Sequence, residues 1–349
     1  MTSYNRAQPM LPARSRHALA ISMAAAIIAA GALFMQASAS ARPSVRAHGA
    51  SSLSIGISDN SPTTFSDPRF RWLGMKFARL LVPWDIVKYP TELAWENAWL
   101  EAARAHHVTP LVAFNHDPHH PMLLPSLTAY GKAVKRFMTL YPWVHEYTPW
   151  NEENHYLQPT AKNPHRAAQY FDLLTLMCRT CTVTAADVLD IPNMAEWTEK
   201  FLRYARVRPR FWGLHNYVDL SAGEHTRTAL FLSIVPGQVW FTETGGVVWR
   251  YEGSSHHYVV HDEAYAAKVA GNLLGLAAIS SRVRRIYYYQ WRVRYSLAWA
   301  RRHGTISWDS GIIRPDCSLR PAFSVIARAL GHNPAHAPHA KHNSAGACV

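Results

Sequence analysis

The feature that most constrains the fold is a regular alternation, from Leu53 onward, of short apolar or β-branched runs with longer amphipathic stretches. This alternation predicts repeated strand-helix units around a parallel sheet. Eight of the short runs have strand character, a number that favours a closed barrel over an open doubly wound sheet. A chain of 349 residues also fits one large α/β barrel better than two average domains.

We therefore expect an α/β protein with a single domain, a (β/α)₈ TIM barrel at residues 51–333. The predicted strands are Leu53 to Ser58, Phe77 to Val82, Thr109 to Phe114, Val144 to Thr148, Thr182 to Ala186, Phe211 to Asn216, Gln238 to Thr242 and Arg285 to Gln290. The clearest helical patterns are Thr91 to Ala105, Leu127 to Leu140, Pro164 to Cys178, Met194 to Ala205, Asp262 to Ala278 and Pro321 to Leu330. The patterns at Pro68 to Leu73 and His225 to Ile234 are weaker and predict short or irregular helices.

The ends of the chain differ in composition from the barrel. Three arginines followed by an apolar run from Ala18 to Phe34 and small residues near Ala39 predict a signal peptide over residues 1–41. An uncleaved membrane anchor is the alternative, because the run is close to the shortest length that spans a bilayer. Residues 42–50 then form a short linker. The Pro/Ala/His-rich residues 334–349 predict a mobile tail.

The predicted leader makes the mature protein secreted or bound to the cell envelope, without a stable membrane insertion after cleavage. The net charge of +13 falls to +10 when the three arginines of the leader are removed. This excess favours an anionic partner such as an acidic glycan, a cell-wall polymer or lipid headgroups, or else a surface tuned only for solubility. Lysines and arginines are dispersed and form no nucleic-acid motif, so no nucleic-acid partner is expected.

The four cysteines favour disulfides in an exported protein. Cys178 and Cys181 have the spacing of a redox pair or half of a zinc site, but no second pair completes a metal signature. Cys317 and Cys348 would then join the tail to the barrel. Four cysteines allow three pairings, so this pairing stays open.

Carboxylates follow two of the predicted strands. The fourth strand ends in Trp150-Asn151-Glu152-Glu153, and the seventh in Thr242-Glu243-Thr244-Gly245. Working groups of such barrels lie at the carboxyl ends of the strands, so both carboxylates should face one mouth. Glycoside hydrolysis needs two carboxyl groups placed in this way. Glu152 is preferred to Glu153, because adjacent residues at a strand end point in opposite directions.

These residues resemble the clan A glycoside hydrolases, most closely families 5 and 39. The resemblance implies that Glu152 is the acid/base and Glu243 the nucleophile, and that Asn151 binds the sugar. It covers most of residues 51–333 and implies further substrate-binding roles for Arg79 on the second strand, His116 after the third, His215 and Tyr217 at the sixth, and Trp291 after the eighth. One residue departs from the pattern, since Glu153 stands where the clan usually has proline.

The resemblance implies a retaining β-glycosidase that works by double displacement. The charge of Glu243 is expected to raise the pKa of Glu152, which then falls once Glu243 is glycosylated. No cofactor and no metal are expected, because Pro118 interrupts the His-rich run from Asn115 to His120. A polysaccharide-binding barrel without activity and a transglycosylase with the same residues remain the alternatives. The sugar, the linkage and endo or exo action are not predicted.

Overall fold

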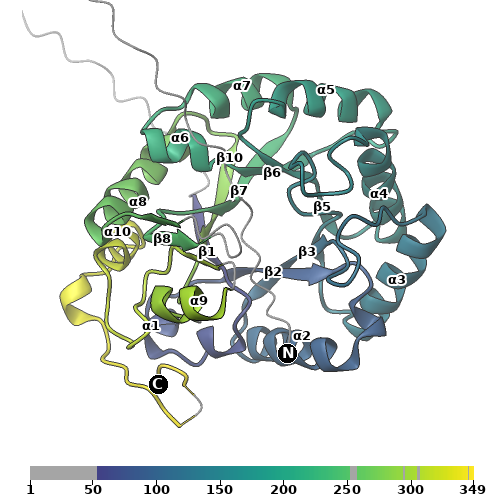
Figure 1. Ribbon diagram of the computed structural model, residues 1–349. Coiled ribbons are helices and arrows are strands. Elements are labelled where there is room, and N and C mark those ends of the chain that lie inside the picture. Colours follow the sequence, from purple (N-terminus) through teal and green to yellow (C-terminus); the bar gives the residue numbers. More distant parts are fainter. Residues whose placement is uncertain (1–52, 252–257, 294, 305–306, 345) are drawn as a thin grey trace, which may run out of the picture. The chain divides into compact units, whose positions relative to one another are not determined.

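The computed structural model describes residues 53–251, 258–293, 295–304, 307–344 and 346–349. The predicted leader and linker lie outside these residues. Eight parallel strands close into a barrel in the order β1-β10-β7-β6-β5-β4-β3-β2 (Figure 1). Their bounds are β1 (Ser54–Ser58), β2 (Phe77–Pro83), β3 (Thr109–Asn115), β4 (Glu146–Thr148), β5 (Thr182–Leu189), β6 (Phe211–His215), β7 (Gln238–Thr244) and β10 (Val283–Tyr289). All eight predicted strands and the barrel are confirmed.

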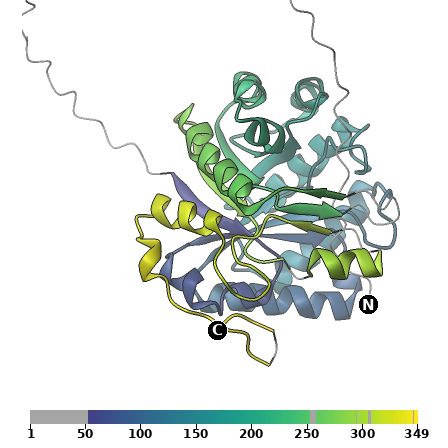
Figure 2. The same cartoon turned by 60° about the vertical axis from the view of Figure 1, so that its left-hand side comes forward.

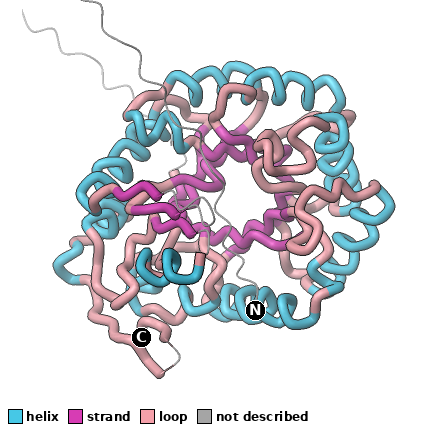
Figure 3. Tube along the Cα trace, in the orientation of Figure 1, coloured by secondary structure: helices cyan, strands magenta, loops and turns pink. Residues whose placement is uncertain are grey.

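Helices form a ring outside the strands (Figure 3). They are α1 (Pro68–Trp72), α2 (Pro90–Ala105), α3 (Leu127–Leu140), α4 (Pro164–Met177), α5 (Met194–Tyr204), α6 (Tyr217–Ala222), α7 (Thr226–Ile234), α8 (Glu263–Ala278), α9 (Leu297–His303) and α10 (Pro321–Ala329). Each predicted helix is present, and the two weak patterns became the short helices α1 and α7. Among the described residues, no helix is long and apolar enough to cross a membrane.

Two long connections after β7 and β10 contain structure that the sequence patterns did not predict. β8 (Trp249–Tyr251) pairs antiparallel with both β9 (Tyr258–Val260) and β11 (Ser307–Asp309) to form a small second sheet (Figure 2). α6 and α9 are also additions. These strands have only three residues each, too few to give a recognisable alternation.

The core is continuous between the barrel and the helix ring. At the N-terminal end of the strands, the guanidinium of Arg285 lies 3.8 Å from the ring centre of Phe77 and 4.0 Å from that of Trp240, and it bonds to Glu146 at 2.5 Å. This cluster fills the interior of the barrel at the N-terminal end of the strands. The described residues thus contain the whole barrel and its core.

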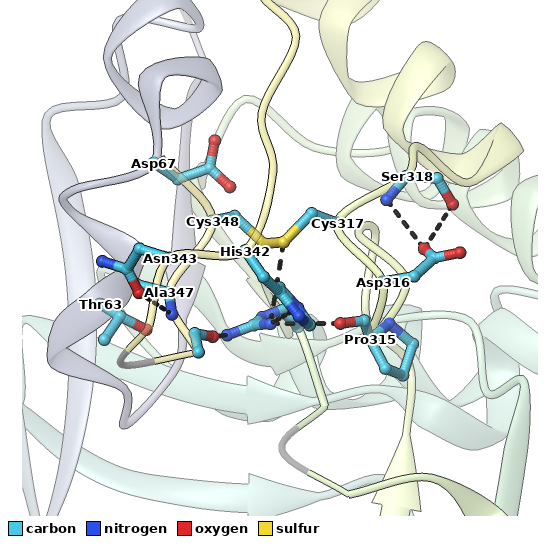
Figure 4. The surroundings of a disulfide bond; sticks show 12 residues. Thr63, Asp67, Pro315, Asp316, Cys317, Ser318, His342, Asn343, Ala347 and Cys348 are labelled. Carbon is cyan, nitrogen blue, oxygen red and sulfur yellow. Dashed lines mark hydrogen bonds between the residues drawn. A yellow bond between two sulfur atoms is a disulfide. The ribbon is translucent and has the colours of Figure 1, made fainter.

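Both disulfides expected from the cysteines are present, Cys178–Cys181 and Cys317–Cys348. Cys348 is the second-last residue of the sequence. The second disulfide attaches Cys348 to the segment before α10 (Figure 4). Next to this bond, His342 and Cys348 pair across a short turn. The disulfide therefore fixes the tail where expected, while the mobility of the rest of residues 334–349 stays a prediction.

Candidate active site

Glu152 and Glu153 diverge at the end of β4. Glu152 has a φ of 51°, in the left-handed region that costs energy for a residue other than glycine and that is enriched at functional sites. Its side chain is 14% exposed. Glu153 is fully buried, and its carboxylate accepts the backbone N–H of Asp187 at 2.8 Å. Of the two carboxyl groups, only that of Glu152 reaches solvent, as expected from the strand geometry.

Glu243 lies near the end of β7 and is held by two donors from distant parts of the chain. Arg79 of β2 donates to Oε2 at 2.8 Å, and the hydroxyl of Tyr217 donates to Oε1 at 3.2 Å. Burial raises the pKa of Tyr217 well above its ordinary value, and the charge of Glu243 raises it further, so the hydroxyl stays a donor. These two bonds fix the orientation of the carboxylate across the barrel mouth.

Arg79 is the centre of a buried network that joins both sides of the site. Besides Glu243, its guanidinium donates to the side-chain oxygen of Asn151 at 2.6 Å and to Asp187 of β5 at 2.7 Å. Burial opposes its charge, but the carboxylates of Asp187 and Glu243 keep its pKa above the ordinary value. The predicted residues Arg79, Asn151 and Glu243 therefore lie in direct contact.

His215, at the end of β6, connects Glu152 to the same network. Its Nδ1 lies 3.2 Å from Oε1 of Glu152, and its Nε2 lies 3.6 Å from Oδ2 of Asp187. Burial disfavours the imidazolium, but the neighbouring carboxylates of Asp187, Glu152 and Glu243 outweigh burial and raise the pKa of His215 to about 9. His215 is thus a cation between two carboxylates at neutral pH.

The pKa of Glu152 differs in direction from the sequence expectation. Burial raises it, but the hydrogen bond and charge of His215, with smaller contributions from His155 and Arg79, lower it below 4.5. The expectation considered only the charge of Glu243, and it is wrong for this state because the positive charge of His215 is in direct contact. Both shifts favour a proton on His215 over a proton on Glu152.

Glu152 and Glu243 face each other at short range. One side-chain oxygen of each, together with a ring nitrogen of His215, lie within 4.8 Å of one another. This trio is where a metal ion would find ligands. However, these groups already have partners: Arg79 donates to Glu243, and Nδ1 of His215 lies 3.2 Å from Oε1 of Glu152. In a second group, Cys317, His342 and Cys348, both sulfurs are used in the disulfide.

Two predicted residues lie outside this network. His116, at the end of β3, is half-buried, and its Nδ1 lies 3.2 Å from Oε1 of Gln158, which also accepts the indole N–H of Trp150. It is therefore on the correct rim and joined to the β4 segment.

The structure corrects the sugar-binding role predicted for Trp291. Its ring is 2% exposed, its N–H donates to Asp67 at 3.1 Å, and it packs edge-on against Phe70 and Phe323. The prediction that this indole contacts a sugar is wrong, because the chain turns inward after β10 and places the ring beneath α1 and α10.

The sequence analysis missed three residues of this region. Asp187 is a polar residue near the end of an otherwise apolar strand, the same pattern that selected Glu152 and Glu243. It was missed because the predicted strand ended at Ala186, whereas β5 continues to Leu189. Tyr289, at the end of β10, is half-buried; burial raises its pKa, and the charge of Glu243 raises it further. Gly213 leaves room for the carboxylate of Asp187, which a Cβ would overlap.

No family model matches the sequence, and no curated protein matches it significantly. Solved structures share the fold. Xylanase 10B of Thermotoga maritima aligns with a TM-score of 0.57 at 12% identity, over 80% of this chain and 95% of that one. GH5_18 of Streptomyces cattleya, solved with GlcNAc, gives 0.55 at 14% identity, over 81% and 80%. GH5_18 of Bifidobacterium longum subsp. infantis gives 0.55 at 12% identity, over 85% and 84%. At these identities the likeness shows the architecture: the chain has the (β/α)₈ barrel found in clan A glycoside hydrolases.

Proposed function

We propose that the protein is a retaining β-glycosidase that hydrolyses a β-linked poly- or oligosaccharide by double displacement. The observation that carries the proposal is the short separation of Glu152 and Glu243: one carboxylate oxygen of each lies within 4.8 Å of the other. Retaining enzymes have carboxyl groups about 5–5.5 Å apart, whereas inverting enzymes need about 6.5–9.5 Å to admit a water molecule. The separation favours direct attack on the sugar.

The roles follow from the contacts of each carboxylate. Glu243, oriented by Arg79 and Tyr217, attacks the anomeric carbon. Glu152 protonates the leaving oxygen with the proton that His215 holds on Nδ1, 3.2 Å away, which leaves His215 neutral. In the second step Glu152 accepts a proton from water, and water displaces Glu243. Glu152 and His215 therefore act as a coupled pair that carries one catalytic proton.

Asn151 and Tyr289 complete the proposed sugar site, and His116 is proposed at its outer part. Asn151 is anchored through its oxygen to Arg79, so its amide nitrogen remains to contact a sugar hydroxyl. Tyr289 is included because it ends β10 at the same rim and the charge of Glu243 contributes, after burial, to its raised pKa. An acidic or cell-envelope glycan is one candidate substrate. Both disulfides fit a secreted or envelope location.

The first experiment is hydrolysis of a panel of aryl β-glycosides and β-linked polysaccharides by wild type, Glu243→Gln, Glu152→Gln and the surface control Glu224→Gln. We expect Glu243→Gln to lose nearly all activity and Glu224→Gln to lose none. Glu152→Gln should lose about 10²–10⁴-fold on substrates with poor leaving groups and far less on dinitrophenyl glycosides, which leave without protonation. Azide, which needs no base, should restore its turnover.

The anomeric form of the first product, followed by NMR, tests the stereochemistry, and a β product is expected. An α product would contradict double displacement. Added acceptor sugars separate hydrolysis from transglycosylation. If nothing in the panel is cleaved while glycan binding is equal in all variants, the barrel binds polysaccharide without acting on it.

A further inference from the structure

The face of the barrel opposite the candidate site is formed by the connections that run from each helix to the next strand, and its charge has one sign. Seven such connections lie in the described residues: 73–76, 106–108, 141–145, 178–181, 205–210, 235–237 and 279–282. They contain no Asp or Glu. Their basic residues are Lys76, Arg179, Arg206, Arg208, Arg210 and Arg282, together with His106, His107 and His145. We call this surface the N-terminal face.

The other side of the barrel is different. Every connection from a strand to the following helix carries at least one carboxylate, from Asp59 and Asp67 after β1 to Asp309 and Asp316 after β10, except the single residue Asn216 between β6 and α6. The positive excess of the chain is therefore concentrated away from Glu152 and Glu243. This separation argues that the N-terminal face has a partner of its own.

Stabilisation of the helix dipoles explains only part of this charge. Helices end at the N-terminal face, and cations in a last turn are favourable there. Arg104 of α2 and Arg203 of α5 already occupy such positions. Arg206, Arg208 and Arg210 lie beyond the end of α5, where the effect of the dipole has faded.

These arginines are available for contact. Their side chains are exposed, and among the described residues none of the three has a carboxylate partner. The nearby Asp172 is occupied by the backbone N–H groups of Arg206 and Val207. Arg208 and Arg210 also line a shallow groove of about 300 Å³ whose other wall is residues 236–238.

Large apolar side chains are exposed at the ends of the helices that lead into the same face. Leu140 at the end of α3 is 51% exposed, Leu176 near the end of α4 is 57% exposed, and Ile279 after α8 is 41% exposed. A surface that mixes cations with exposed aliphatic side chains is typical of proteins that lie on a membrane interface. A soluble polyanion would use the cations but gain little from the leucines.

We propose that the N-terminal face docks on an anionic lipid bilayer, with the catalytic mouth turned away from the membrane. The spread of Lys and Arg over four of the seven connections, with histidines in two more, fits an extended flat partner better than a single polymer strand. Leu53 leads into β1 at this face, so the segment that precedes it is attached there.

The test is co-sedimentation of the chain without its predicted leader, from residue 42 onward, with vesicles of phosphatidylglycerol mixed with phosphatidylcholine or of phosphatidylcholine alone. A cation near an anionic surface contributes about fivefold to partitioning. Arg206→Ser, Arg208→Ser and Arg210→Ser together should therefore weaken binding to the anionic vesicles about a hundredfold. The matched control replaces Lys162, Lys268 and Arg302 by serine, which removes the same charge elsewhere, and should change binding only a few-fold.

The apolar contribution is tested with Leu140→Ser and Ile279→Ser, which should reduce the binding that persists at high salt. Circular dichroism verifies that each variant is folded. An equal loss in both triple variants would mean that only net charge matters. Tight binding to soluble dextran sulfate with no binding to anionic vesicles would overturn the proposal in favour of a polyanionic glycan.

Discussion

Asp187 is the residue whose replacement most directly tests the electrostatics of the candidate site. This buried carboxylate accepts from Arg79, which holds Glu243, and lies 3.6 Å from the ring of His215, which contacts Glu152. Asp187→Asn keeps the shape of the side chain and removes the charge. We expect Asp187 to act as a positioning residue through these two cations, without touching the substrate.

The magnitude follows from His215. Its pKa of about 9 is well above the ordinary 6.5, a difference worth about 3 kcal/mol at 1.36 kcal/mol per unit. Because the folded-state pKa is raised, this stabilisation is complete below pH 6.5 and is lost as the pH rises through 9. A single opposite charge in contact shifts a pKa by about 1–3 units. Asp187→Asn should lower the pKa of His215 by about one to two units.

The assay is the pH dependence of kcat/KM on the best substrate of the panel. Wild type should lose activity above about pH 9, where the shared proton of His215 and Glu152 is lost. In Asp187→Asn this alkaline limb should move toward neutral pH. Asp190→Asn is the matched control, because Asp190 also follows β5 but accepts the backbone N–H groups of Val218 and Asp219.

NMR titration of ¹³C-labelled histidine, with His215→Gln to assign the signal, measures the same shift without substrate. It therefore separates a failure of this reasoning from a failure of the proposed activity. An unchanged His215 titration together with an equal loss of activity at every pH would refute the reasoning and leave Asp187 a purely structural role.

Three further predictions concern other buried or bordering residues. Burial raises the pKa of Glu96 to about 8, so the folded state loses stability as the pH rises from 4.5 to 8. Glu96→Gln should therefore raise the unfolding free energy by up to about 3 kcal/mol at pH 7. Denaturant titrations should show no gain in stability for this variant below pH 4.5. Tyr289→Ala should lower kcat/KM with little change in stability. Trp291→Ala should instead cost about 3–5 kcal/mol of stability and leave KM unchanged. If the two variants behave in the opposite way, the indole of Trp291 contacts the sugar after all. Gly213→Ala places a methyl group on the carboxylate of Asp187, so its pH profile should resemble that of Asp187→Asn, and an unchanged profile would contradict the proposed contact.

The sequence by itself determined the barrel and the placement of its two central carboxylates. Each strand and most helices carry a local pattern, and parallel strands in a closed barrel bring their carboxyl ends to one rim. Glu152 and Glu243 could therefore be placed together from their positions after the fourth and seventh strands. The same local information predicted the short or irregular α1 and α7, because their patterns are weak.

Only the tertiary structure decided the contacts that set the chemistry. Arg79 and Glu243 are 164 residues apart, and nothing local to either sequence segment specifies their bond. The direction in which a side chain points after a strand ends depends on what packs against it, so Trp291 was placed in the cleft by position but lies in the core. The pKa of Glu152 falls rather than rises for the same reason: an electrostatic shift depends on distance in space, and His215 reaches Glu152 only when the barrel closes.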